Sequence, residues 1–108
     1  MKKQYPFADA VTLLKRHVST WSIRLKLNPK IVRVQHMTHK WGSCSTKGIL
    51  TLAIDLNEQD QRFQDFVIVH ELLHLRVQNH SRLFKALMTN YVPGWRELEI
   101  KRMTEFRI

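Results

Sequence analysis

Residues 70–80 read His-Glu-Leu-Leu-His-Leu-Arg-Val-Gln-Asn-His, and this stretch decides what kind of domain the chain forms. His70 and His74 are four residues apart, so on a helix both imidazoles point in the same direction. Two imidazoles on one helix face provide half of a tetrahedral metal site. Glu71 lies beside the first histidine, where it can take a proton from a metal-bound water. The stretch therefore predicts a helix that carries a catalytic zinc site.

We expect the third protein ligand to come from beyond the end of this helix. A helix that continued through His80 would turn that side chain about 80° away from the face of His70. The helix must therefore end first, and the chain must bend back. We predict the bend at Asn79, because asparagine tolerates the left-handed conformation that ends many helices, whereas the β-branched Val77 resists it. Three protein ligands and one water describe a catalytic zinc rather than a structural one.

Two roles in such a site stay open from the sequence. Glu97 or Glu99, near the C-terminus, competes with His80 as the third metal ligand. Peptide hydrolysis also requires a donor that stabilises the oxyanion of the transition state. Tyr91, His36 and His39 are candidates for this role, and the sequence does not choose among them.

The residues around the motif predict three helices in the second half of the chain. Asp60 is the expected N-cap of the motif helix, and Ser81 is the expected N-cap of the next one. Pro93-Gly94 separates that helix from a last one. The expected buried face of the motif helix consists of Phe63, Phe66, Val67, His70, His74 and Val77. The two later helices have apolar sides formed by Leu83, Phe84, Leu87 and Met88, and by Trp95, Leu98, Met103 and Phe106.

The first half predicts one amphipathic helix followed by two strands. Apolar residues recur every three or four positions over about 7–27, and Asn28-Pro29 ends this helix. Its buried stripe is expected to be Phe7, Val11, Leu14, Val18, Trp21 and Leu25, and its solvent face Lys15, Ser19, Ser22 and Lys26. Alternating residues predict strands over 31–41 and 49–56, joined as a hairpin through a turn at Gly48. The expected fold is α+β: an N-terminal helix, a small β-hairpin or sheet, the active-site helix and C-terminal helices.

Composition predicts a soluble protein of one domain, residues 1–108. Cys44 is the only cysteine, which excludes an internal disulfide and favours a reducing compartment. No signal peptide or membrane-spanning run is present in the sequence, so we expect a cytoplasmic protein without membrane association. The net charge is +9. The basic surplus lies in the flanks, at 1–33 and 81–108, and permits association with nucleic acid.

Four blocks of sequence together resemble one family more specifically than the zinc motif does. They are Trp41-Gly42-Ser43-Cys44-Ser45, Gly48-Ile49-Leu50-Thr51-Leu52, the segment 66–75 around the motif, and Asn79-His80-Ser81-Arg82-Leu83-Phe84. In this order and spacing they resemble the YgjP-like metallopeptidases, which are relatives of the SprT and WLM zinc proteases. The resemblance covers about 31–97. It implies a zincin-like fold with Zn²⁺ held by His70, His74 and His80, and with Glu71 as the catalytic base.

The resemblance also implies a protein or peptide substrate, hydrolysed through a zinc-bound water. Family members commonly carry an additional N-terminal β-rich portion, so this chain looks like a minimal form. Residues Ile49, Leu50, Thr51 and Leu52 are expected to form an edge strand that pairs with extended substrate.

Two other functions compete with a peptidase. A metal-dependent endoribonuclease of the YbeY type has the same histidine spacing but lacks the glutamate after its first histidine, so Glu71 favours the peptidase. The third possibility is a non-catalytic, zinc-stabilised nucleic-acid-binding or regulatory domain. In that case a partner or the tail Lys101–Ile108 would fill the open position of the metal.

Overall fold

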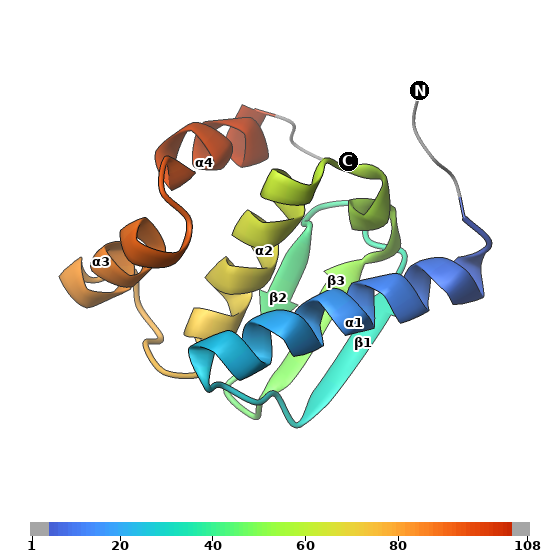
Figure 1. The fold of residues 1–108 in the computed structure, drawn as a ribbon, viewed down its shortest axis with the longest axis horizontal. Helices are drawn as coiled ribbons and strands as arrows, with labels where there is room; N and C mark the ends of the chain where they lie inside the picture. The colour runs from blue at the N-terminus through green and yellow to red at the C-terminus, as the bar shows by residue number, and fades with distance from the viewer. Residues whose placement is uncertain (1–4, 105–108) are drawn as a thin grey trace.

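The computed structural model describes residues 5–104, which form four α-helices and a three-stranded sheet on one side of them (Figure 1). Phe106 and the end of the tail, which the sequence assigns to the last helix and to a blocking role, lie outside the described residues. The elements, in chain order, are α1 Phe7–Leu25, β1 Ile31–Gln35, β2 Gly42–Cys44, β3 Ile49–Ala53, the short 3₁₀ helix η1 Ile54–Glu58, α2 Gln61–Leu73, α3 Arg82–Tyr91 and α4 Trp95–Thr104. The α+β class is confirmed.

The sheet has the order β1-β3-β2, which differs from the expected hairpin. β1 pairs with β3 in parallel, with Ile31 opposite Ile49, whereas β2 pairs with β3 in antiparallel fashion, with Ser43 opposite Thr51. The expected strand over 31–41 ends at Gln35, and the chain then enters the sheet a second time as β2. The predicted hairpin of the first two strands is therefore wrong, because a third strand lies between them in sequence.

The turn that closes the true hairpin, between β2 and β3, lies where the sequence places it. Gly48 has a φ of 84°, and its N–H donates to the carbonyl oxygen of Ser45 at 3.0 Å. The Ser45 hydroxyl oxygen accepts from the N–H groups of Lys47 and Ile49. Glycine is required here because other residues adopt a positive φ at a cost. The strand after the turn ends at Ala53, three residues before the expected end, because η1 begins at Ile54.

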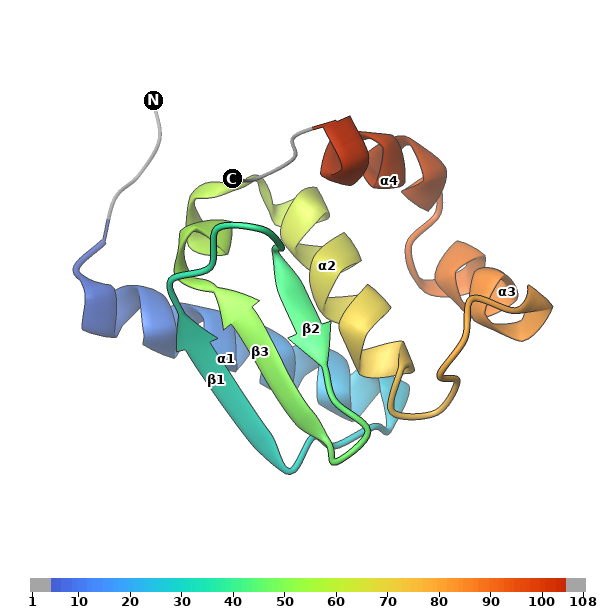
Figure 2. The same cartoon turned by 180° about the vertical axis from the view of Figure 1, so that it is seen from behind.

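α1 and α2 cover one face of the sheet, α3 and α4 pack beside α2, and Figure 2 shows the other face with no helix in front of it. Leu50 and Leu52 of β3 point into the core and are fully buried, whereas Ile31 and Arg33 of β1 are exposed. α1 packs on β1, η1 and α2, and α2 packs on β2, α3 and α4. No helix of the described part has the length and apolar character that crossing a bilayer requires.

α2 begins as predicted, because the Asp60 side chain accepts a hydrogen bond from the Phe63 N–H at 2.8 Å. Its residues from Phe63 to Leu73 are all buried except Asp65, so α2 is the central element of the core. Two details of α1 differ from the expected stripe. Ser22, assigned to the solvent face, is 6% exposed, and Phe7, assigned to the buried face, is 51% exposed.

α1 ends in an unusual conformation. Its C-cap, Lys26, has φ 58° and ψ 41°, and its N–H donates to the Ser22 carbonyl. Lys26 is the only non-glycine with a positive φ within residues 5–104. Glycine is the usual residue at such a position, because a Cβ in the left-handed conformation costs about 1–2 kcal/mol.

We expect Lys26→Gly to unfold with a free energy about 1 kcal/mol larger than that of Lys26→Ala, because only glycine removes the Cβ from the left-handed residue. Both variants lose the same charge, so the comparison isolates the backbone term. Urea unfolding monitored by circular dichroism measures the difference. Equal stability of the two variants would contradict the strained conformation of Lys26.

Candidate metal centre

The last two turns of α2 bring two chemically active side chains into the core. His70 and Glu71 are 7% and 8% exposed, and the His70 ring packs against Phe66 at a centroid distance of 5.8 Å. His74 follows as the C-cap of α2 and is half-buried. Burial of a carboxylate is costly unless it is paired. Here Glu71 Oε2 lies 2.9 Å from His70 Nδ1, which supplies that partner.

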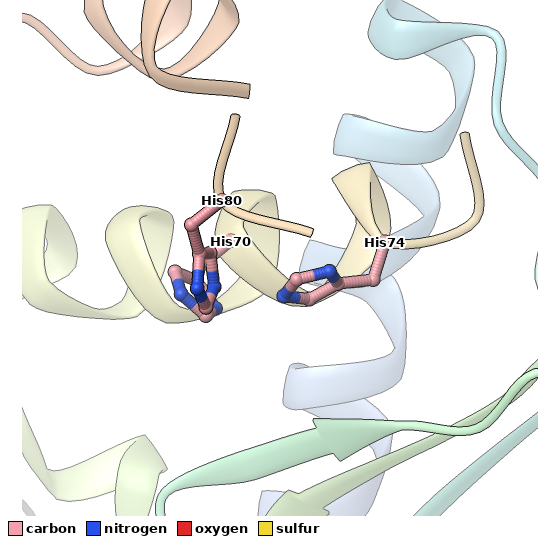
Figure 3. A group of neighbouring side chains, drawn as sticks. All are labelled: His70, His74 and His80. Atoms are coloured by element: carbon pink, nitrogen blue, oxygen red, sulfur yellow. The ribbon is translucent and has the colours of Figure 1, made fainter. Parts of the chain in front are cut away.

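His80 approaches the two helix histidines from the segment between α2 and α3 (Figure 3). One ligand nitrogen from each of His70, His74 and His80 lies within 4.8 Å of the other two. The ring centroids are 5.0–5.1 Å apart in every pair. Three imidazoles at this spacing form a donor set that can hold a metal ion.

The chain leaves α2 earlier than predicted. The α-helix ends at Leu73, and a turn over 74–76 follows, in which the Val77 N–H still donates to the Leu73 carbonyl at 2.8 Å. The expected left-handed residue at Asn79 is absent, because Asn79 has no positive φ. The chain does reverse before His80, as predicted. The reversal begins where the last helical turn tightens, so it needs no left-handed residue.

Hydrogen bonds orient two of the three imidazoles. His74 Nδ1 lies 3.1 Å from the Val77 carbonyl oxygen, and His70 Nδ1 lies 2.9 Å from Glu71 Oε2. Both acceptors favour a proton on Nδ1, which leaves Nε2 with the lone pair that a metal requires. The carbonyl partner of His74 exists only because the chain turns at the end of α2. The same turn therefore positions His80 and orients His74.

Phe84 supports the whole histidine group, a role that sequence reasoning missed. Its ring stacks on His74 at 4.9 Å and contacts His70 and His80 edge-on at 5.3 and 4.8 Å. Ser81 caps α3 as predicted, by accepting from the Phe84 N–H at 3.4 Å, and so fixes where this ring lies. The sequence assigned Phe84 only to the apolar side of α3. The feature of the sequence that could have revealed this role is the spacing of four residues between His80 and Phe84.

Gly42 allows β2 to lie directly against Glu71. A methyl group on Gly42 would lie 3.1 Å from Leu52 Cδ2 and 3.2 Å from Glu71 Cγ, which is tighter than almost all contacts of this kind. Any larger residue would push the strand away from α2. This explains in physical terms why glycine follows Trp41, whose ring packs edge-on against Phe63 at 5.4 Å.

A cleft of about 410 Å³ opens between β2 and the end of α2, with Glu71 and His74 in its wall. Its other lining residues are Lys40, Gly42, Ser43, Cys44, Ser45, Thr46 and Gln78. The edge strand beside this cleft is β2, whereas the expected substrate strand, Ile49 to Leu52, is central and hydrogen-bonded on both sides. The predicted edge strand was therefore wrong, because the Trp41–Ser45 block contributes a strand of its own.

None of the three oxyanion candidates lines this cleft. The Tyr91 ring packs edge-on against Trp21 at 6.4 Å, and the His36 ring contacts Phe7 at 5.6 Å. His39 is exposed in the segment between β1 and β2. Lys40 and Gln78, which the sequence did not single out, do reach the cleft.

The competing ligand Glu99 lies near the histidines but is paired. It lines a second cavity, of about 230 Å³, together with His70 and His80. Burial raises the pKa of the Glu99 carboxyl, but the hydrogen bond and charge of Arg102 outweigh burial and hold the pKa below its ordinary value. Glu97 is exposed, and it is not among the residues that line this cavity.

Burial and neighbouring charges shift the pKa of His80 down and the pKa of Cys44 up. Burial, and then the neighbouring His70 and His74, lower the pKa of His80, which favours the neutral imidazole that binds metals. Burial, and then the charge of Glu71, raise the pKa of the Cys44 thiol. A thiol with a raised pKa is a poor nucleophile at neutral pH.

Comparisons with known proteins agree on a family and a fold. The family model described as YgjP-like, metallopeptidase domain, matches residues 5–102. The metallopeptidase zymogen jannalysin of Methanocaldococcus jannaschii is 26% identical, with a TM-score of 0.66 over 94% of this chain and 98% of the other. The metallopeptidase zymogen abylysin of Pyrococcus abyssi shares the fold, with 22% identity and a TM-score of 0.72 over 85% of this chain and 93% of the other.

No curated protein sequence matches the chain significantly. The family match spans nearly all of the described residues, including every residue of the histidine group and the cleft. The chain therefore belongs to the YgjP-like family of metallopeptidase domains.

Proposed function

We propose that this protein is a zinc-dependent peptidase in which His70, His74 and His80 hold the metal and Glu71 is the general base. The observation that carries the proposal is that His74 of the histidine group and Glu71 both line one cleft. Membership of a metallopeptidase family supports peptides as the substrate class. Three nitrogen ligands suit zinc, and they leave one coordination position open, as in catalytic zinc sites.

In this mechanism each residue of the site would have a separate role. A bound zinc ion would supply a Lewis acid and lower the pKa of its water. Glu71 would accept a proton at its carboxylate and pass it to the leaving amine. His74, held by the Val77 carbonyl, and His70 would keep the ligand nitrogens aimed at one point. β2 would hold an extended peptide by backbone hydrogen bonds, since it pairs only with β3 within the described sheet.

We expect Glu71→Gln to bind as much zinc as the wild type but to cleave an unfolded protein such as casein about 10²–10⁴ times more slowly, because it lacks the base. Zinc content by elemental analysis and cleavage by gel or mass spectrometry give the two readouts. Glu97→Gln, on exposed α4 surface, serves as the matched control and should cleave like the wild type.

Several outcomes would contradict this mechanism. Cleavage by Glu71→Gln at the wild-type rate would show that Glu71 is not the general base. Wild-type protein that binds zinc and cuts RNA but no peptide would favour the endoribonuclease. Zinc binding without cleavage of either polymer would favour a non-catalytic domain.

We expect His80→Ala to lower zinc affinity more than about tenfold, because even residues that only hydrogen-bond to metal ligands change affinity 10- to 100-fold. Competition with a chromophoric chelator measures the affinity. Glu99→Gln should retain the wild-type affinity within a few-fold, since Arg102 already occupies that carboxylate. The reverse ranking of the two variants would make Glu99 the third ligand.

We expect Cys44→Ser to retain zinc and cleavage, because the raised thiol pKa makes Cys44 unsuited to nucleophilic attack at neutral pH. In the wild type, iodoacetamide should react more slowly with Cys44 than with glutathione at pH 8. Glu71→Gln should speed this reaction, because it removes a charge that disfavours the thiolate. Rapid alkylation that abolishes cleavage, together with an inactive serine variant, would show that the thiol takes part.

A further inference from the structure

The cleft at Glu71 continues into a second groove, of about 300 Å³. The two hollows are contiguous because they share wall residues, namely Ser45, Thr46, His74 and Gln78. The second groove runs past the end of β2, over the β2–β3 turn and toward the end of α1. A chain lying along β2 over Glu71 would therefore enter it.

The wall of this second groove is strongly basic. Lys26 follows α1, Lys30 precedes β1, and Lys47 lies in the β2–β3 turn, and all three side chains are exposed. The groove has no acidic residue in its lining. We call these three residues the lysine groove. They are 27–48 residues from His74 in sequence. Lys26 and Lys30 belong to the basic flank 1–33, and the fold brings them into one groove with His74.

Backbone contacts hold the lysines in this arrangement. The Lys30 N–H donates to the Gly48 carbonyl at 2.8 Å, which joins the start of β1 to the turn that carries Lys47. A methyl group on Gly48 would lie 3.3 Å from Lys30 Cγ, so the glycine gives room to the Lys30 side chain. The backbone segments that carry Lys30 and Lys47 are therefore held side by side by the fold.

Lys26 adds an independent sign of function. It occupies a left-handed position where glycine would remove the strain. Strain that a single substitution would relieve points to a role for the side chain present. Lys26 lines the groove together with the next two residues of the chain, Leu27 and Asn28.

We propose that the lysine groove binds acidic side chains of the peptide substrate, so that the enzyme prefers to cleave just after acidic segments. This inference rests on the proposed peptidase function. A peptide pairs more stably with an edge strand in antiparallel orientation. β2 runs from Gly42, beside Glu71, toward the turn, so an antiparallel peptide places its N-terminal part in the lysine groove. The acidic residues therefore lie on the N-terminal side of the cleaved bond.

Nucleic acid is the other polymer that lysines attract. The groove has no Phe, Tyr or Trp in its lining, whereas single-stranded nucleic acid is normally bound on such rings. It also leads directly to the cleft with Glu71, which a bound peptide must reach. These two observations favour an acidic peptide.

The test is the cleavage-site profile of the zinc-loaded wild type on a mixed peptide library, read by mass spectrometry. We expect Asp and Glu to be enriched on the N-terminal side of the cleaved bonds. A matched peptide pair carries either two glutamates or two glutamines on the N-terminal side of the cleaved bond. We expect the ratio of kcat/KM values to be about fivefold in favour of the glutamate peptide at low salt, which is the effect of two or three solvated ion pairs. The preference should shrink as ionic strength rises.

Lys30→Gln/Lys47→Gln should bring this ratio close to one, and Lys30→Arg/Lys47→Arg should restore it because the charges return. The control pair Lys15→Gln/Arg33→Gln, which removes two exposed charges outside the groove, should keep the wild-type ratio. Lys26→Gly should lower the ratio while making the protein more stable. A lower ratio together with higher stability would show that Lys26 serves substrate binding at the expense of stability.

Failure of this inference is distinct from failure of the proposed function. If the wild-type protein cleaves no peptide, the proposed peptidase function is wrong. Cleavage with equal rates on the acidic and amide peptides leaves the peptidase intact and overturns the lysine groove. Acidic enrichment on the C-terminal side would overturn the antiparallel placement. Loss of oligonucleotide binding in Lys30→Gln/Lys47→Gln with an unchanged peptide ratio would assign the groove to nucleic acid instead.

Discussion

Close packing of α2 against β2 is the contact on which the rest of the molecule depends. α2 is buried along almost its whole length, so it cannot shift without disrupting the core. Gly42 allows β2 to contact it at Glu71, and this single close approach defines one wall of the cleft. The same helix ends at the point where the chain must turn to bring His80 back. A small domain thus uses one helix both as its core and as the floor of its site.

The buried pair of His70 and Glu71 shows how the core tolerates polar groups. An isolated carboxylate at 8% exposure would carry a large desolvation penalty, but the neighbouring imidazole nitrogen satisfies one of its oxygens. The pair therefore stabilises itself with residues adjacent in sequence. Phe84 then closes the site from α3 by contacting all three imidazoles. One aromatic ring thus packs against three imidazoles that come from two separate segments.

Local signals in the sequence predicted local structure well, and non-local pairing poorly. Asp60 and Ser81 act as N-caps, and Gly48 turns the chain, because each depends on contacts within four residues. The order β1-β3-β2 depends on pairing across 18 residues, which alternation of apolar residues cannot reveal. The strand β2 has only three residues, which is too short for a pattern of alternating residues to predict it. For this reason the strand beside the cleft was misassigned, while the histidines were correctly brought together.

Several of the nine acidic residues of this chain make contacts within the fold, which leaves fewer carboxylates to balance the basic side chains at the surface. Asp60 caps α2, Asp65 accepts from the Trp21 indole and contacts His17, and Glu99 pairs with Arg102. Residues 10–54 contain eight Lys and Arg and no Asp or Glu, so the sheet, and α1 beyond Asp9 in its first turn, have no carboxylate of their own to neutralise them. In the half of the chain that carries the histidine group and Glu71, these acidic side chains form internal contacts. The half that borders the cleft keeps unbalanced charge, and a field of one sign along a groove attracts polymers of the opposite sign.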